Sequence, residues 1–81
     1  MNGWESWDHW QTALWISNEQ EYYNVLQELT ELVVYGHMPR DKAITTLIEC
    51  LPEQTPDGAT WKSDVVARLL DEEYEEMIQY S

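Results

Sequence analysis

The sequence is short of cysteine, of basic residues and of long apolar runs, and each shortage removes a class of protein. Cys50 is the only cysteine among 81 residues, so no disulfide can form within the chain. A single thiol also favours a reducing, cytoplasmic setting. No apolar run is long enough to cross a bilayer. The N-terminus carries Trp, Glu and Asp in place of the basic residues of a signal peptide, so no export signal is predicted.

Basic residues are absent from the first half of the chain. Residues 1–39 contain no Lys or Arg, and over the whole chain 4 basic residues stand against 16 acids, for a net charge of -12. Without a basic stripe, direct binding to nucleic acid or to an anionic membrane is disfavoured. An acidic surface instead favours a partner with a basic surface, because long-range attraction speeds association. The alternative is that the acids only keep the protein soluble.

Large aromatic side chains are what the chain has in excess. It carries 5 Trp and 5 Tyr but no Phe. A domain of this length lies near the smallest size at which one core stabilises a fold, so these rings are the expected source of apolar area. Such a content also argues against disorder. We therefore expect one acidic helical domain that spans residues 1–81.

Apolar periodicity predicts two helices in the first half. Ser6 is the expected N-cap of the first helix, and Ser17 and Asn18 end it, with either of them available to cap the second. Gly36 stands where a left-handed residue ends the second helix. One continuous apolar stripe marks that second helix. The stripe consists of Tyr22, Val25, Leu26, Leu29, Leu32 and Val33.

Two more helices are predicted in the second half. Pro39 fits the first turn of the third, which Pro52 ends. A loop over residues 52–58 closes with a Pro-Asp-Gly turn, and Thr60 or Ser63 caps a last helix that runs to about residue 79. The third helix has its stripe at Ala43, Ile44, Leu47, Ile48 and Leu51. The predicted fold class is all-α, a compact bundle of three to four short helices whose second and third members form an antiparallel hairpin.

No set of residues has the spacing of a catalytic or metal site. His9 and His37 are interpreted as solvated surface histidines, since no His or Cys pair stands at metal-ligand spacing. Cys50 is expected to be a buried or half-buried apolar residue. Neither a phosphate-binding glycine loop nor a nucleophile elbow is present. We therefore expect no enzyme, no cofactor and no metal.

Two tryptophans and a run of acids are the candidate partner-binding residues. Trp7 and Trp10 share a stripe with Leu14 and are assigned to the core. Trp15 lies off that stripe and Trp4 precedes the helix, so each either packs as a lid on the bundle or stands exposed as an interface anchor. Acids late in a helix oppose its dipole and repel one another, which indicates a fraying end or a surface kept acidic for a partner. The acids in question are Asp71, Glu72, Glu73, Glu75 and Glu76.

Two segments carry a resemblance to a known family. Residues 6–19 read SWDHWQTALWISNE, with a Tyr pair at 22–23. This resembles the signature N-[YW]-E-T-W-x-x-x-L-W-I-x-N-[DE] of small proteins common in bacteriophage genomes and mobile elements. The TPDG turn at 55–58, before a closing acidic helix, is also similar to members of that family. Ser6, Asp8 and His9 depart from the signature. The resemblance implies a phage or mobile-element origin and brings no activity with it.

These observations lead us to expect an accessory protein that binds and modulates a host protein, by inhibition. A sharper form is a DNA mimic, whose carboxylates occupy the groove of a nucleic-acid-binding protein. Mimicry requires the late acids to form a regular array with Glu28, Glu31 and Glu49 on one face. The alternative is a self-associating structural domain, a homodimer whose off-stripe aromatics meet across a two-fold axis.

Overall fold

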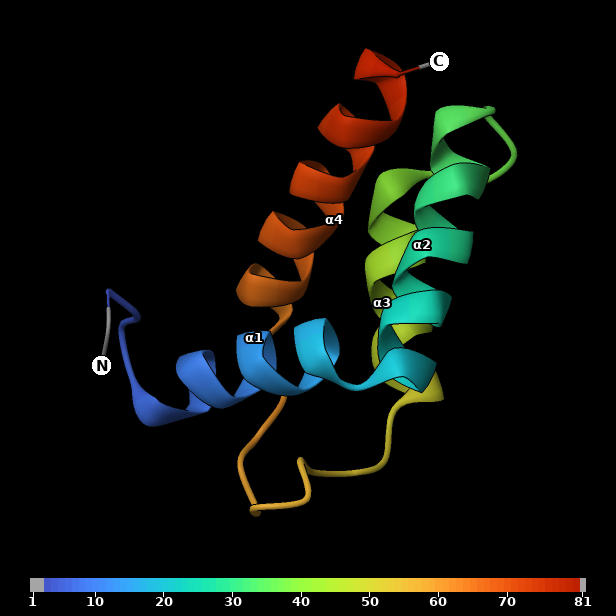
Figure 1. Ribbon diagram of the computed structural model, residues 1–81. Helices are drawn as coiled ribbons and strands as arrows, with labels where there is room; N and C mark the ends of the chain where they lie inside the picture. The colour runs from blue at the N-terminus through green and yellow to red at the C-terminus, as the bar shows by residue number, and fades with distance from the viewer. Residues whose placement is uncertain (1–2, 81) are drawn as a thin grey trace.

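The computed structural model describes residues 3–80, which fold into four helices and contain no strand. The helices are α1 (Trp7–Asn18), α2 (Gln20–Val34), α3 (Arg40–Cys50) and α4 (Ser63–Gln79). Helices α2, α3 and α4 pack side by side, and α1 lies crosswise at one end of them, against α2 and α4 (Figure 1). The predicted all-α bundle is confirmed. Among these described helices, none combines the length and the apolar content needed to cross a membrane.

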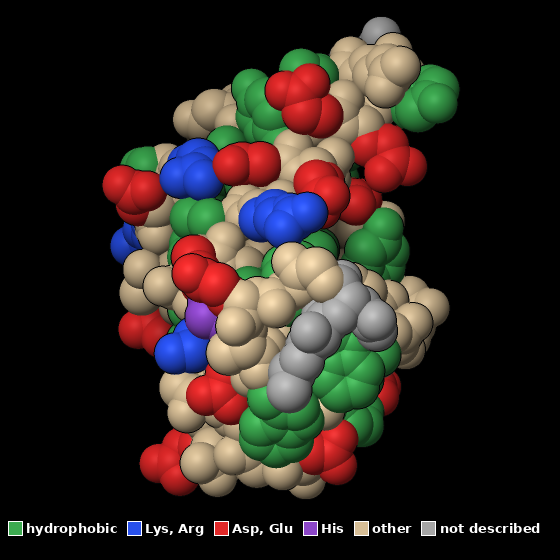
Figure 2. Space-filling model, turned by 90° about the vertical axis from the view of Figure 1, so that its left-hand side faces the viewer, with side chains coloured by type: hydrophobic (Ala, Val, Ile, Leu, Met, Phe, Trp, Pro, Cys, Tyr) green, Lys and Arg blue, Asp and Glu red, His purple; other side chains and the backbone are tan. Residues whose placement is uncertain are grey.

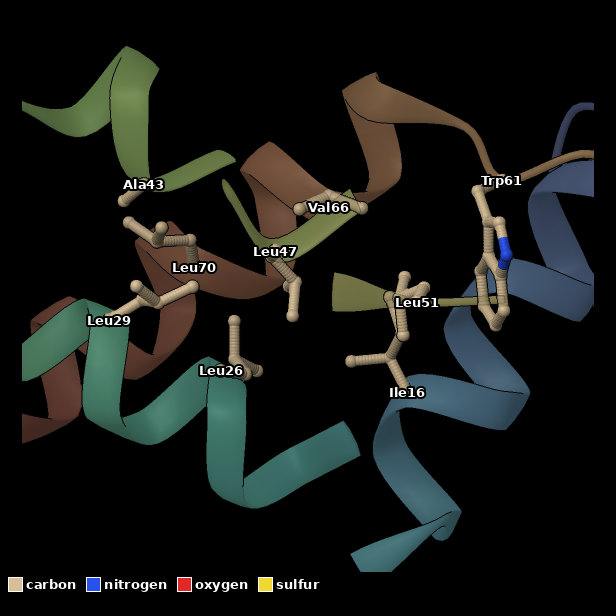
Figure 3. Close-up of a cluster of buried hydrophobic side chains, with 9 residues drawn as sticks. All are labelled: Ile16, Leu26, Leu29, Ala43, Leu47, Leu51, Trp61, Val66 and Leu70. Atoms are coloured by element: carbon tan, nitrogen blue, oxygen red, sulfur yellow. The ribbon is translucent and has the colours of Figure 1, made fainter. Parts of the chain in front are cut away.

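One cluster of buried side chains joins all four helices. Figure 3 shows Ile16 of α1 pointing toward side chains of α2 and α3, with Leu70 of α4 at the far end of the same cluster. The stripes predicted for α2 and α3 supply most of the cluster, which confirms that the two helices face each other. Its members are Ile16, Leu26, Leu29, Ala43, Leu47, Leu51, Trp61, Val66 and Leu70.

Trp61, to which the sequence analysis assigned no role, is the buried tryptophan of this cluster. Its indole Nε1 donates a hydrogen bond to the carbonyl of Pro52 at 2.7 Å. Its ring meets that of Tyr22 edge to face, with the centroids 5.9 Å apart. The polar edge of the indole is thereby satisfied inside an apolar site, which is the usual requirement for a buried tryptophan.

The stripe predicted for α1 is not the side that the helix buries most deeply, since Trp10 and Leu14 are only half-buried. The buried residues of α1 are Gln11, Thr12, Ala13 and Ile16. Trp7, assigned to the core, is 40% exposed. At 100° per residue, Trp7 lies about 180° round the helix from Ile16. Because α1 lies across the end of the bundle, it buries one narrow side, and its first turn extends past α4 (Figure 1).

Two predicted helix ends are confirmed. The Ser6 hydroxyl accepts a hydrogen bond from the backbone N–H of His9 at 3.3 Å and so caps α1. Gly36 adopts a φ of 75°, the left-handed conformation that glycine takes at little cost. The N–H of His37 reaches the carbonyl of Leu32 at 2.8 Å, and the N–H of Gly36 reaches Val33 at 3.1 Å. These two hydrogen bonds form a Schellman motif, which ends α2 and turns the chain into α3.

The predicted start of α2 is wrong. Ser17 and Asn18 both belong to α1, and the Asn18 amide donates to the carbonyl of Leu14 at 2.9 Å. Glu19 alone separates the two helices. Its N–H donates to Trp15 and its carbonyl accepts from Tyr23, both at 2.9 Å. Neither Ser17 nor Asn18 caps α2, which begins without a side-chain cap.

The predicted starts of α3 and α4 also shift. Pro39 is the N-cap of α3, and helical geometry begins at Arg40. Lys62, in place of Thr60 or Ser63, is the N-cap of α4 and makes no side-chain cap. The hydroxyl of Thr12, fully buried in α1, instead accepts the N–H of Lys62 at 3.0 Å. The start of α4 is therefore held by a hydrogen bond to a side chain of α1, which no local sequence motif indicates.

The loop between α3 and α4 contains the turn predicted at residues 55–58. The N–H of Gly58 donates to the carbonyl of Thr55 at 2.8 Å, and the N–H of Ala59 donates to the Thr55 hydroxyl at 2.9 Å. Gly58 has a φ of 90°, which a residue with a Cβ rarely adopts. The loop passes beneath α1 before it reaches α4 (Figure 1). This path brings the start of α4 beside the first turns of α1.

Candidate protein-binding surface

Glu73 is not part of the exposed acidic surface to which it was assigned. Its side chain lies between α2 and α4 and is 8% exposed. Tyr23 donates its hydroxyl to Oε2 at 3.0 Å, and Gln27 donates its amide to Oε1 at 3.3 Å. The hydrogen bond to Glu73, burial, and the negative charges of Glu73 and Glu76 raise the pKa of Tyr23, because all three disfavour the phenolate. Glu73 therefore links two helices.

The other four acids of the run are exposed, but basic residues lie among them. Asp71 accepts two hydrogen bonds from the Arg40 guanidinium, each 2.8 Å long. This pairing lowers the pKa of Asp71 and raises that of Arg40. Arg40 and Arg68 line one shallow groove with Asp71, Glu72 and Glu75. Figure 2 shows blue side chains lying between red ones on the α4 side of the molecule. This face carries mixed charge.

The remaining acids considered for the array lie on other helices. Glu28 and Glu31 border a groove on α2 together with Leu32, Tyr35 and His37, and none of these residues lines the α4 groove. Glu49 is exposed near the end of α3. The acids thus divide among several faces of the bundle.

Neither candidate tryptophan stands free as an anchor. Trp15 is half-buried against the apolar cluster, and its indole donates to the Gln11 side chain at 2.8 Å. Trp4 is half-buried, and the Arg68 guanidinium lies 4.6 Å from the centroid of its ring. Of the two alternatives left open for Trp15, the structure favours the lid. Trp4 makes a cation–π contact that ties the N-terminal segment to α4.

Three further assignments of single residues are settled by their exposure. Cys50 is exposed, which corrects the expectation of a buried or half-buried residue. It lies at the last position of α3, where the helix ends. His37 is exposed, as predicted. His9 is not a solvated histidine, because its side chain is only 15% exposed and contacts Glu5 and Asp64.

An apolar surface that the sequence analysis missed lies at the end of the bundle opposite α1. Tyr35 is 67% exposed and Leu32 is 38% exposed. Tyr35 shares one groove with Leu32 and a second with Val34 and Met77 of α4. Glu31 borders both grooves and Glu28 borders the first. We call this surface the Tyr35 patch: Leu32, Val34, Tyr35 and Met77 with Glu28 and Glu31.

The Tyr35 patch exists because the buried face of α2 is rotated from the centre of its stripe, which leaves Leu32 at the edge of that face. Leu26 and Thr30 are buried, and the Thr30 hydroxyl is satisfied by the carbonyl of Leu26 at 2.7 Å. Leu32 lies about 120° round the helix from Leu26, so it turns toward solvent. Tyr35 follows at the helix end, where the Schellman turn holds it outside the core. Apolar periodicity alone assigns Leu32 to the core and Thr30 to the surface, and the packing of α2 reverses both assignments.

Aromatic and aliphatic side chains bordered by acids are typical of surfaces that bind other proteins, in which tyrosine is a frequent anchor. The fold and this surface together define a small all-α bundle with an acid-bordered apolar face. The chain belongs to a family of unknown function, DUF7249, whose model matches residues 1–80. No curated protein and no solved structure matches it.

Proposed function

We propose that this protein is a small accessory protein of phage or mobile-element origin that binds a host protein and inhibits it. The observation that carries the proposal is the Tyr35 patch, in which a 67% exposed tyrosine lies between apolar side chains and acids. An exposed apolar group lowers the solubility of a protein, and a bound partner that covers the group removes its apolar surface from water. The sequence resemblance supports the origin.

Charge decides which partner fits the patch. Glu28 and Glu31 border it, and the whole chain carries -12. A second copy would bring two sets of these acids together, which opposes the homodimer considered from the sequence. A protein with an apolar recess surrounded by Lys or Arg satisfies both the tyrosine and the carboxylates. The proposed partner is therefore a basic host protein, and the proposed place of action is the host cytoplasm.

DNA mimicry stays a hypothesis within this proposal. It requires a regular row of carboxylates, and on the α4 face Arg40 and Arg68 lie among the acids. Two cations within such a row would repel the basic groove of a nucleic-acid-binding protein. We therefore assign partner contact to the Tyr35 patch, and a nucleic-acid-binding protein remains one kind of basic partner that fits it.

Two exposed aromatics at opposite ends of the bundle give a matched test. A partner is captured from host lysate on the immobilised wild type and identified, and its binding is then measured by surface plasmon resonance with Tyr35→Ser and with Trp7→Ser. We expect Tyr35→Ser to weaken binding at least about tenfold, mainly through faster dissociation, as for an anchor residue. Trp7→Ser, at the other end of the molecule, should bind as the wild type does. Equal binding by both variants, or loss on Trp7→Ser alone, would contradict the proposal.

A further inference from the structure

Three metal-ligating side chains from two distant parts of the chain meet beside the start of α1. Glu5 precedes α1, His9 lies in its first turn, and Asp64 lies in the first turn of α4. The His9 Nε2 atom is 3.2 Å from a Glu5 oxygen and 3.1 Å from an Asp64 oxygen. One ligand atom from each of the three lies within 4.8 Å of the other two. The site is far from the Tyr35 patch and independent of it.

These separations fit the edges of a metal coordination sphere. Zinc binds imidazole nitrogen and carboxylate oxygen at about 2.0–2.2 Å, so two ligands of one tetrahedral ion lie about 3.3–3.6 Å apart. The carboxylates of Glu5 and Asp64 are exposed, so they can turn to bring their oxygens, which lie within 4.8 Å of each other, to this spacing. Without metal, Nε2 lies 3.1 Å from the Asp64 carboxylate, with which it shares a hydrogen bond, and 3.2 Å from that of Glu5.

The other ring nitrogen of His9 is held in the orientation that a metal ligand needs. The Ser6 hydroxyl lies 2.6 Å from His9 Nδ1 and also accepts the backbone N–H of His9. When Nδ1 carries the ring proton and donates it to Ser6, the lone pair of Nε2 is directed at the carboxylates. Histidines that bind metals usually donate their second N–H to an oxygen in this way. The N-cap of α1 thus also fixes the imidazole.

The three ligands open onto a cavity that an ion can enter. It has a volume of about 230 Å³, and Gly3, Trp4, Val65 and Arg68 complete its lining. The Arg68 guanidinium is stacked over the Trp4 ring. Figure 2 shows histidine (purple) next to both acidic and basic side chains on this side of the molecule. The cavity leaves room for water as a fourth ligand, which completes a tetrahedron.

We propose that Glu5, His9 and Asp64 bind one divalent transition-metal ion, with Zn²⁺ as the ion that fits best. An imidazole with two carboxylates suits zinc, whereas Ca²⁺ and Mg²⁺ prefer oxygen ligands throughout. The bound ion fastens the segment before α1 to the start of α4, 55 residues further along the chain than His9. In a domain with a small core, such a link stabilises the folded state.

Calorimetric titration with Zn²⁺ near neutral pH tests the site, together with thermal unfolding and the visible spectrum of the Co²⁺ form. We expect one saturable site per chain, a raised Tm and the intense visible bands of tetrahedral Co²⁺. His9→Gln should abolish the site, whereas His37→Gln, the matched exposed histidine, should leave it unchanged. An equal effect of His9→Gln and His37→Gln would overturn the proposal.

Two carboxylate variants guard against a loss that comes from misfolding. Glu5→Gln alters an exposed side chain outside the helices, and Asp64→Asn keeps the oxygen that accepts the N–H of Val65. Each should weaken Zn²⁺ binding at least tenfold while the metal-free circular dichroism stays that of the wild type. If Ca²⁺ or Mg²⁺ produces the same rise in Tm as Zn²⁺, the acids bind cations without a specific site and the proposal is wrong.

Discussion

At the scale of single residues, Glu73 shows how a side chain can differ from its neighbours in the same run. Residues 71–76 contain five acids in six positions, and by composition all five belong on the surface. The turn of α4 places one of them against α2, where Tyr23 and Gln27 donate hydrogen bonds to it. A buried carboxylate requires such donors, because burial without them costs several kcal/mol. Variants that neutralise the exposed acids of residues 71–76 should therefore keep Glu73 unchanged, so that the fold is not disturbed.

Replacing Glu73 by Gln tests this role. Glutamine keeps an oxygen for Tyr23 but carries no charge, so the hydrogen bond from Tyr23 loses its charge assistance and Gln27 must turn its amide over to accept from the new NH₂ group. We expect a loss of about 1–3 kcal/mol in the free energy of unfolding, measured by urea denaturation. Glu76→Gln, three residues on and exposed, is the control and should change the free energy by no more than about 0.5 kcal/mol. Equal midpoints for both variants would show that the hydrogen bonds to Glu73 contribute nothing.

At the scale of secondary-structure elements, α2 shows that the apolar stripe of a helix need not coincide with the face that the helix buries. All six residues of the predicted stripe are apolar, yet Leu29 is 7% exposed and Leu32 is 38% exposed. The face that packs against α3 and α4 is centred nearer Leu26 and Thr30. A helix buries the side that its neighbours cover, and polar residues with a local acceptor, such as Thr30, are tolerated there.

Two leucines of that helix separate the interpretations. Leu29→Ala should lower the free energy of unfolding by about 2–5 kcal/mol, because it removes contacts from the cluster of all four helices. Leu32→Ala should change it by no more than about 0.5 kcal/mol, because the side chain is already partly in water. Urea denaturation of both proteins provides the comparison. Similar losses would mean that α2 is rotated from the orientation described.

At the scale of the whole molecule, the two ends of the bundle differ in chemistry. One end, formed by α1 and the start of α4, carries the histidine and carboxylate cluster with Trp4. The other end, where α2 and α4 finish, exposes the Tyr35 patch and also Ile78 and Tyr80. Between them the α4 face mixes acids with Arg40 and Arg68. The net charge therefore determines how far the electric field of the molecule extends, whereas the local arrangement of charged and apolar side chains determines which surface contacts a partner.

The charge pattern predicts which acids speed association with the proposed partner. The double variant Glu28→Gln with Glu31→Gln should slow association and weaken its dependence on salt, with little change in dissociation. Glu72→Gln with Glu75→Gln removes the same formal charge from the α4 face and is the matched control, with a smaller effect on association. Surface plasmon resonance at two salt concentrations measures both. A larger effect of the control pair would move the contact to α4 and revive the mimicry hypothesis.

Much of the secondary structure was determined by the sequence itself. The Ser6 cap, the Gly36 turn, the hairpin of the second and third helices and the turn at residues 55–58 follow from local hydrogen bonds and backbone preferences. Each depends on residues a few positions apart, and such signals are legible in a single chain. The candidate site was predicted less well: four of the five acids are exposed, whereas Glu73 and Trp15 pack inward and the Tyr35 patch went unnoticed.

Only the tertiary structure decided which side of each helix is covered. The crosswise placement of α1 turned Trp7 outward and left Trp61 as the buried tryptophan. It also brought Thr12 to the start of α4 and set His9 beside Asp64. These contacts join residues about fifty positions apart, and their partners are chosen by how four helices fill one small core. Periodicity marks a side of a helix as apolar, but packing determines whether a neighbour covers it.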